Sequence, residues 1–403
     1  MVLGGTRRQV PFRLGYVAAL DGIRGIAVTL VVVYHLGQIL WFDAAGWLMP
    51  GGFVGVDVFF ALSGFLITCL LVGELDRRGR IRLRSFTWRR VLRLTPAFAV
   101  VLAALLIGSL LGWIPHDPLS QAKRTVWALL YVHTWNPRDH FPGPEVAQTW
   151  SLAVEMHFYL LWSAVVAAIA VLASRWARQL MLAFAVAAVV VVMVTRAMRS
   201  LDGQFAVVLF PNTPNRLDGP FVGCIGALAY ASGWLDGLAR RWTVALTLVG
   251  LGGIAVLVAT GNPTSDWFYL GGFTLAALLG TLVVVGGAQL RSEGRLARGL
   301  EWRPLRGLGL VSYSLFLWHM PVFVVLQREA PDWPIPLRAV VALAITAALT
   351  AASYRWVERP VMHLRHGGRT AAIATEPAAP DETSPAPEGL VPPPAPAPAP
   401  AEI

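Results

Sequence analysis

The chain has 403 residues, of which 56% are hydrophobic and only 14% are charged. Soluble globular domains carry about 25% charged residues, so the composition excludes a soluble globular protein and predicts one that crosses a membrane several times. The formal net charge of +10 would suit nucleic-acid binding in a soluble chain. Here the basic residues stand in short segments between apolar runs, which indicates membrane topology and no nucleic-acid partner.

The first segment, residues 1–15, is basic and is expected in the cytoplasm. Its arginines resemble the start of a signal peptide. The apolar stretch that follows is long and carries Arg24 and His35, so we expect a first membrane helix that is retained.

About ten apolar stretches are long enough to cross a bilayer core, which takes about 20 residues per helix. They lie near residues 17–40, 53–73, 94–114, 148–173, 180–197, 218–235, 243–260, 268–290, 307–327 and 338–357. Roughly three times as many basic residues fall on the side of the membrane that holds the N-terminus as on the other side. This bias places both termini in the cytoplasm. The expected fold class is an all-α polytopic membrane helix bundle, N-in and C-in, with residues 16–365 as its transmembrane domain.

Residues 366–403 are rich in proline and alanine and nearly devoid of large apolar side chains. Such a segment cannot bury enough apolar surface to fold, so we expect a disordered, partly polyproline tail in the cytoplasm. The composition, rich in alanine, arginine and valine and poor in lysine, is typical of a bacterium of high GC content. We therefore expect the inner (plasma) membrane.

The first helix contains "RGIAVTLVVVYH", which begins at Arg24 and ends at His35. Eleven residues bring the two side chains to one helix face, about 16 Å apart along the axis. A charge inside a membrane is costly, so such residues have a function or a partner. Asp21 is a candidate partner for Arg24, and a neutral His35 bonded between helices is the structural alternative.

The second span begins "GGFVGVDVFFALSGFLIT" and carries Asp57 just inside its outer end. This carboxylate needs a cation or a donor, and His35, at a similar depth, is one candidate. Ser63 and Gly64 are interpreted as close-packing residues.

Arginines crowd the loop "RRGRIRLRSFTWRRVLRLTP", and Arg89, Arg90 and Arg93 stand at the mouth of the third span. Arginine forks match phosphate oxygens in pairs, so this cluster predicts a polyanion such as a nucleotide-bearing donor. Positive-inside topology and lipid headgroups are the alternative explanation.

The fourth span opens "TWSLAVEMHFYLLW", entering from outside, and brings Glu155 to a depth like that of His35. A carboxylate beside an imidazole orients its tautomer and supports it as a general base. The alternative is that Glu155 only ties helices together.

Polar side chains also mark two later spans. "NRLDGP" places Arg216 and Asp218 at the outer mouth of the sixth span, and "SYSLFLWHMP" carries Tyr313 and His319 in the ninth. "VERP" follows at the inner end of the tenth.

No metal site is predicted. Cys69 and Cys224 stand in apolar runs and are interpreted as small buried side chains. The loop histidines His116, His133 and His140 lack metal-ligand spacing.

Taken in order, "R-x10-H", "GVDVFFALSGFLI", "RRVLRLTP", "WSLAVEMHFY", "NRLDG", "SYSLFLWHMP" and "ERP" resemble the acyltransferase-3 family of integral membrane O-acyltransferases. The resemblance covers roughly residues 16–362. It implies transfer of an acyl group, often acetyl from acetyl-CoA, to a hydroxyl of a glycan, a lipid-linked sugar or a natural product. Many relatives append an SGNH hydrolase-like domain; here we expect the transfer to finish within the membrane domain.

The resemblance and the residue chemistry together give three sets of expected site residues. The expected catalytic residues are His35, Glu155 and Asp57. Those expected to bind the acyl-CoA co-substrate are Arg24, Arg89, Arg90 and Arg93. Those expected to bind the acceptor are Arg216, Asp218, His319 and Tyr313.

The residues suggest a path for the donor: its phosphates stay with the cytoplasmic arginines while the pantetheine arm carries the thioester up to His35. His35 would act as a general base or as a covalent carrier of the acyl group. A proton-coupled exporter or flippase is the alternative function, because buried histidine and carboxylates also suit a proton relay. The acceptor, the acyl chain length and the oligomeric state stay open.

Overall fold

The computed structural model describes residues 11–40, 49–114, 117–135, 143–204, 206–290 and 294–361. All of them belong to one compact unit of the chain, residues 1–361. The predicted tail, the start of the predicted N-terminal segment, His116 and His140 lie outside the described residues.

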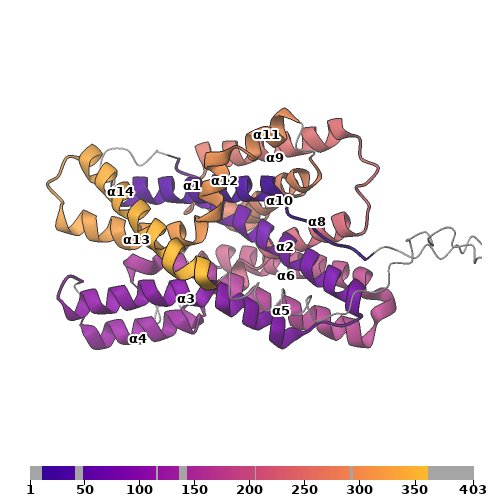
Figure 1. The fold of residues 1–403 in the computed structure, drawn as a ribbon, viewed down its shortest axis with the longest axis horizontal. Coiled ribbons are helices and arrows are strands. Elements are labelled where there is room, and N and C mark those ends of the chain that lie inside the picture. Colours follow the sequence, from indigo (N-terminus) through magenta and orange to yellow (C-terminus); the bar gives the residue numbers. More distant parts are fainter. Residues whose placement is uncertain are drawn as a thin grey trace, which may run out of the picture. The chain divides into compact units, whose positions relative to one another are not determined.

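Regular secondary structure in these ranges is helical throughout (Figure 1), which confirms the predicted all-α bundle. The α-helices are α1 (Ala18–Leu40), α2 (Gly55–Arg78), α3 (Leu83–Leu110), α4 (Pro118–Leu129), α5 (Trp150–Leu172), α6 (Ala177–Leu201), α7 (Ala206–Leu209), α8 (Asp218–Ala231), α9 (Arg240–Thr260), α10 (Phe273–Gln289), α11 (Arg295–Leu300), α12 (Arg303–Leu310), α13 (Ser312–Glu329) and α14 (Ile335–Ser353). Short 3₁₀ or π segments are η1 (Gly52–Val54), η2 (Val132–Thr134), η3 (Pro144–Thr149), η4 (Ser174–Trp176), η5 (Thr213–Asn215), η6 (Phe268–Gly272) and η7 (Tyr354–Glu358).

Eight helices in the described ranges are long and apolar enough to cross a membrane, and the bent pair α12–α13 would make nine. Helix α8 occupies the place of the predicted sixth span. Its 14 residues extend about 21 Å, less than a hydrocarbon core of about 30 Å. The chain is thus a multi-pass membrane protein in which one expected span is a shorter, largely buried helix.

Helix α3 begins at Leu83, well before the predicted start of the third span. Arg89, Arg90 and Arg93 therefore lie on the helix itself and not in a loop. Residues three apart share a helix face, so Arg90 and Arg93 point the same way while Arg89 is rotated from Arg90 by about 100°.

Helix α4 starts where the sequence provides a cap. The Asp117 side chain accepts hydrogen bonds from the backbone N–H groups of Leu119 and Ser120, and Pro118 follows it as the first helical residue. Both features favour a helix start. Hydrogen bonds from the Ser120 side chain and backbone lower the pKa of the Asp117 carboxyl. In Figure 1, α4 lies beside α3, against which it packs.

Helices α2 and α8 touch through glycines. A Cβ atom at Gly64 would lie 1.9 Å from the Pro220 carbonyl oxygen, and one at Gly223 would lie 2.1 Å from the Ala61 carbonyl oxygen. Small residues at helix contacts in membranes let the backbones approach closely. The interpretation of Gly64 as a packing residue is confirmed.

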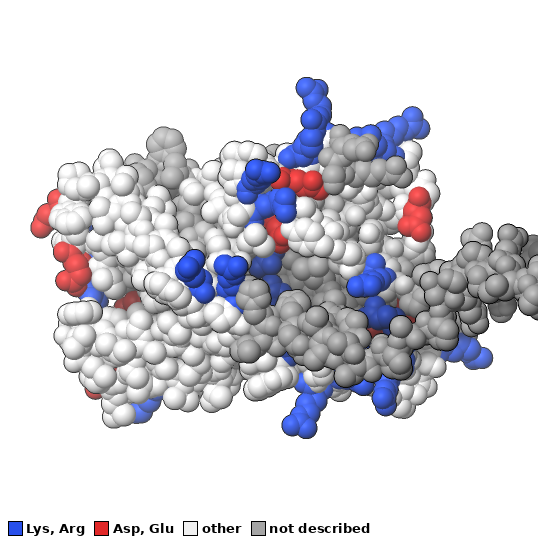
Figure 2. Space-filling model, in the orientation of Figure 1, with Lys and Arg blue, Asp and Glu red and all other residues white. Residues whose placement is uncertain are grey.

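Most Lys and Arg side chains visible in Figure 2 lie over the half of the bundle that contains the C-terminal end of α2. The opposite half of this face is mainly uncharged. Large apolar side chains such as Val191 and Leu248 are exposed on the helices between these ends. This distribution fits a bundle whose basic end faces the cytoplasm.

Candidate active site

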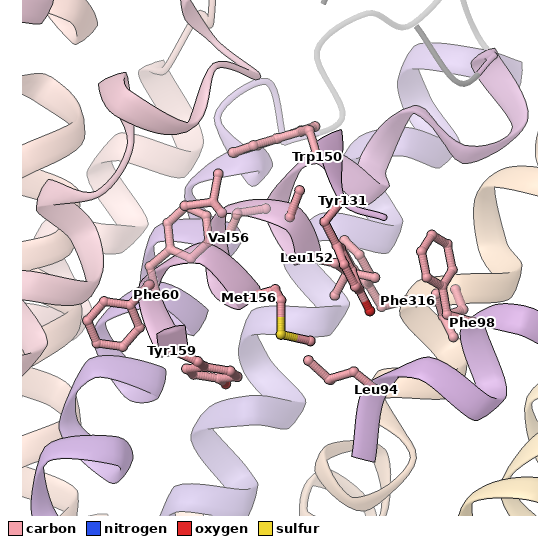
Figure 3. Close-up of a cluster of buried hydrophobic side chains, with 14 of the residues drawn as sticks. Val56, Phe60, Leu94, Phe98, Tyr131, Trp150, Leu152, Met156, Tyr159 and Phe316 are labelled. Carbon is pink, nitrogen blue, oxygen red and sulfur yellow. The ribbon is translucent and has the colours of Figure 1, made fainter. Parts of the chain in front are cut away.

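A cavity of about 80 Å³ lies among α1, α2, α3, α5 and α13. Its charged lining residues are Arg24, Arg90, Arg93 and Glu155, and its hydroxyl groups come from Ser63, Ser151, Tyr159, Ser312 and Tyr313. The remaining wall is apolar and belongs in part to the buried cluster drawn in Figure 3, from which Val56, Phe60, Leu94, Leu152 and Phe316 line the cavity. We call this space the arginine cavity.

Three of the four predicted donor-binding arginines meet in this cavity. Arg24 projects from α1 and donates a hydrogen bond from Nη2 to the Ser312 Oγ atom, 3.1 Å away. Arg90 and Arg93 project from the same face of α3. Arg89 lies outside the lining and bonds to Ser85 on its own helix.

The Arg90 guanidinium is held between aromatic rings. It lies 5.3 Å from the ring centroid of Phe86 and 5.6 Å from that of Tyr159. Contact of a guanidinium with an aromatic face is favourable and limits its side-chain freedom. The cavity therefore presents at least one pre-oriented cation.

Arg24 bonds to a residue other than Asp21, its predicted partner. Asp21 accepts a hydrogen bond from the Tyr16 hydroxyl at 2.7 Å, and Arg24 turns to Ser312 instead. Since α13 begins at Ser312, this bond joins the N-terminal half of α1 to the start of α13.

Glu155 lies in the arginine cavity and not beside His35, which corrects the expected pairing of the two. Its Oε1 atom accepts hydrogen bonds from Ser63 and Tyr159. The η3 segment, which precedes α5 in the chain, is largely buried. Helix α5 therefore starts inside the bundle, and Glu155 lies deeper than expected. Arg24 is a charged neighbour of this carboxylate, about 16 Å along α1 from His35.

His35 pairs with a second histidine. Its Nδ1 atom lies 3.0 Å from Nε2 of His319, and the ring centroids are 5.1 Å apart with the planes at 33°. His319 is fully buried and lies against Phe316 and Phe323. His35 is absent from the described lining of the arginine cavity, but Phe316 both lines that cavity and contacts His319.

Pro321 influences the geometry of this pair. A proline inside α13 cannot donate the hydrogen bond that the Leu317 carbonyl would normally receive. The Gln148 Nε2 atom donates to the carbonyl oxygens of Phe316 and Leu317 at 3.2 and 3.3 Å instead. The η3 segment thus fixes the turn of α13 that carries His319.

Asp57 bonds to Arg216, not to His35, which corrects the second expected contact of His35. The Asp57 Oδ1 and Arg216 Nη2 atoms are 2.7 Å apart, and both side chains are no more than 2% exposed. The Arg216 guanidinium lies 3.7 Å from the Phe273 ring centroid, with Trp150 and Phe210 at 5.2 and 5.1 Å.

A second buried ion pair lies next to it. Asp218 accepts from Arg196 at 2.8 Å and from the Thr274 hydroxyl at 2.5 Å. Arg196 also donates to Thr274 and to the carbonyls of Tyr269 and Asn215. These five side chains, Asp57, Arg196, Arg216, Asp218 and Thr274, form what we call the outer ion-pair cluster.

This cluster places two predicted acceptor-binding residues, Arg216 and Asp218, in a fully buried position instead of an outer mouth. Arg196 was not among the predicted site residues. The available signal was its position directly after the apolar run "VVVVMVT", where a basic residue needs a partner.

Tyr313 lines the arginine cavity and donates its hydroxyl to the Leu94 carbonyl. Ser63, Tyr159 and Ser312 were not predicted as site residues. Tyr159 could have been found from its spacing, because it follows Glu155 by four residues and shares its helix face. Ser63 was interpreted only as a packing residue, and its bond to Glu155 depends on the neighbouring helix.

Within the described ranges, no group of three or more His, Cys, Asp or Glu residues is placed to hold a metal ion. Cys69 and Cys224 are buried and free.

A family model described as "Acyltransferase domain" matches residues 17–355 of the chain. The chain is 31% identical over 359 residues to O-acetyltransferase OatA of Staphylococcus aureus (strain NCTC 8325 / PS 47), a match that covers 86% of the chain and 57% of the relative. It is 29% identical over 362 residues to a putative O-acetyltransferase of S. aureus strain COL, covering 86% and 58%. The chain thus spans little more than half the length of these relatives. No solved structure matches it significantly.

Proposed function

The chain belongs to the acyltransferase-3 family, and from this membership we propose that it is an O-acyltransferase of the bacterial inner (plasma) membrane. The donor is acyl-CoA, with acetyl as the acyl group because the matched relatives are O-acetyltransferases. The acceptor is a hydroxyl of a carbohydrate, a cell-envelope glycan or a secreted natural product.

The arginine cavity is the observation that carries this proposal. Arg24, Arg90 and Arg93 come from two helices, border one empty volume, and face Glu155 as the carboxylate among the described lining residues. A surplus of guanidinium groups around a cavity suits the phosphates of a CoA-type donor, because each planar fork can bond two phosphate oxygens.

The chemistry we propose uses His35 as a general base. His35 takes the proton of the acceptor hydroxyl while the hydroxyl oxygen attacks the thioester carbonyl. The C–S bond then breaks, and the thiolate leaves with the proton that His35 returns to it. Proton transfer by a positioned side chain accelerates such steps by about 10² to 10⁴.

Glu155 acts in the arginine cavity and not beside His35. Its carboxylate holds the Ser63 and Tyr159 hydroxyls in place and balances part of the arginine charge. Asp57, Arg216 and Asp218 are assigned to the stability of the outer half of the bundle, because Asp57 forms an ion pair with Arg216 and Asp218 forms one with Arg196.

The test is acyl transfer by the purified protein in liposomes, with radiolabelled acetyl-CoA and a panel of mono- and oligosaccharides as acceptors. His35→Ala is expected to lower transfer at least about 100-fold, and His157→Ala, which removes another imidazole of the membrane domain, to change it little. pH-driven solute movement without any acyl transfer would overturn the proposal and favour the exporter or flippase.

A further inference from the structure

Backbone carbonyls and the His35–His319 contact together indicate where the protons of the two rings lie. The His319 Nδ1 atom is 3.1 Å from the backbone carbonyl oxygen of Leu315. A carbonyl oxygen can only accept a hydrogen bond, so Nδ1 of His319 carries the proton. In a neutral imidazole the other nitrogen then has a lone pair, and Nε2 of His319 is an acceptor.

The same argument applies to the His35 ring on α1. Since Nε2 of His319 accepts, the Nδ1 atom of His35, 3.0 Å away, must be the donor. The neutral His35 ring then has its lone pair on Nε2, the nitrogen that points away from His319. Leu315, His319 and His35 thus form a directional chain of two hydrogen bonds.

We propose that His319 is a positioning residue that fixes the tautomer of His35 and so presents its Nε2 atom as the base. This inference rests on the proposed acyl transfer. An isolated histidine side chain in water favours the proton on Nε2, and in that form the outward nitrogen would be a donor that cannot accept the hydroxyl proton. The second-nitrogen bond of a catalytic histidine is what selects its tautomer.

The surroundings of His319 suit this role. Its ring is enclosed by Phe316 and Phe323, and Gln148 bonds to the carbonyls of the turn that precedes it. When His35 takes up a proton at Nε2, it becomes an imidazolium, and the Nδ1–H bond to His319 becomes charge-assisted and stronger. His319 therefore also stabilises the charged form that the transfer step creates.

A matched pair of substitutions separates this role from simple packing. His319→Gln keeps an oxygen that can accept from His35, whereas His319→Leu has a similar volume and no acceptor. The expected result is that kcat falls about 100-fold in His319→Leu and less than about tenfold in His319→Gln, while KM for acetyl-CoA changes little in either.

The second measurement needs no turnover. ¹⁵N NMR of labelled histidine in lipid bilayers reports which ring nitrogen of His35 is protonated, with the His35 signal identified by its loss in His35→Ala. Protonation at Nδ1 is expected in the wild type and in His319→Gln, and protonation at Nε2 in His319→Leu. If His319→Leu does not fold, His319→Ile, which also has no acceptor, provides the same test.

An unchanged His35 tautomer in His319→Leu would overturn the inference, as would equal loss of activity in the two His319 variants. The wild-type protein could also show no acyl transfer while the His35 tautomer still changes with the residue at position 319. That result would support the tautomer assignment and overturn only the proposed function. The two failures are therefore distinguishable.

Discussion

The arginine cavity and the outer ion-pair cluster are built from the same residue types and differ in what surrounds them. Each combines arginine and carboxylate side chains with aromatic rings inside the helix bundle. In the cavity, Arg24, Arg90 and Arg93 border a space of about 80 Å³. In the cluster, Arg196 and Arg216 are no more than 1% exposed and are bonded directly to Asp218 and Asp57.

This difference teaches that a charge inside a membrane domain does not by itself mark a binding site. A guanidinium that has a carboxylate at 2.7 or 2.8 Å already has a counter-charge in the protein. Arg24 instead bonds to a hydroxyl and borders a cavity. The cluster fastens α2, α6, α8 and α10 together, and the cavity gathers three arginines around one space.

The largest expected effect comes from breaking a pair in the outer cluster. Arg196→Leu leaves the Asp218 carboxylate buried without its cation, which should lower the free energy of unfolding by about 3–5 kcal/mol. Replacing both partners, Arg196→Leu with Asp218→Leu, should recover much of that loss, because no unpaired charge remains. Denaturation of the purified protein in mixed micelles measures both.

The exposed Arg240 provides a control for that comparison. Arg240→Leu should change the free energy of unfolding by no more than about 0.5 kcal/mol. A normally stable Arg196→Leu protein that had lost acyl transfer would contradict the division between the two regions.

The next largest effect is expected in the arginine cavity, where a substitution should weaken donor binding and not stability. Arg93→Leu removes one guanidinium from the donor phosphates, an interaction worth about 1.5–3 kcal/mol, so KM for acetyl-CoA should rise about 10- to 100-fold. Unfolding should be nearly unchanged, because a cation is removed beside an empty volume. The matched control is Arg84→Leu, which alters an exposed arginine on the same helix; equal effects of both would indicate general charge attraction.

The smallest expected effect concerns the hydroxyl that Tyr159 donates to Glu155. Tyr159→Phe keeps the ring that lies beside Arg90 and removes one hydrogen bond, worth about 0.5–1.5 kcal/mol. Acyl transfer, measured as kcat/KM, should fall about two- to tenfold. A loss as large as that of His35→Ala would show that the Tyr159 hydroxyl takes part in the chemistry itself.

Sequence patterns were sufficient for much of the bundle. Apolar length and the distribution of arginines predicted the helices and their order, because both depend on residues close together in the chain. Arg24 was singled out because a charge in an apolar helix is visible without any knowledge of its neighbours, and Arg90 and Arg93 because arginines crowd their segment.

Contacts between distant helices could not be predicted in the same way. The periodicity of a helix gives the direction of a side chain about that helix and does not identify the helix it meets. Glu155 was therefore assigned to His35 on estimated depth alone, and the buried η3 segment shifted it to Ser63 and Tyr159. Asp57 was likewise given His35 as a candidate partner, because Arg216 lies 159 residues away along the chain.

The break between α12 and α13 affects the association rate of an anionic donor. The two helices meet at an angle of 71°, so α13 starts afresh at Ser312, beside Arg24, with no side chain capping its first N–H groups. A helix start carries roughly half a positive charge, and it adds to the field of the three guanidinium groups. An anion approaching this helix start is thus steered before it makes contact, and its association rate should decline steeply as ionic strength increases.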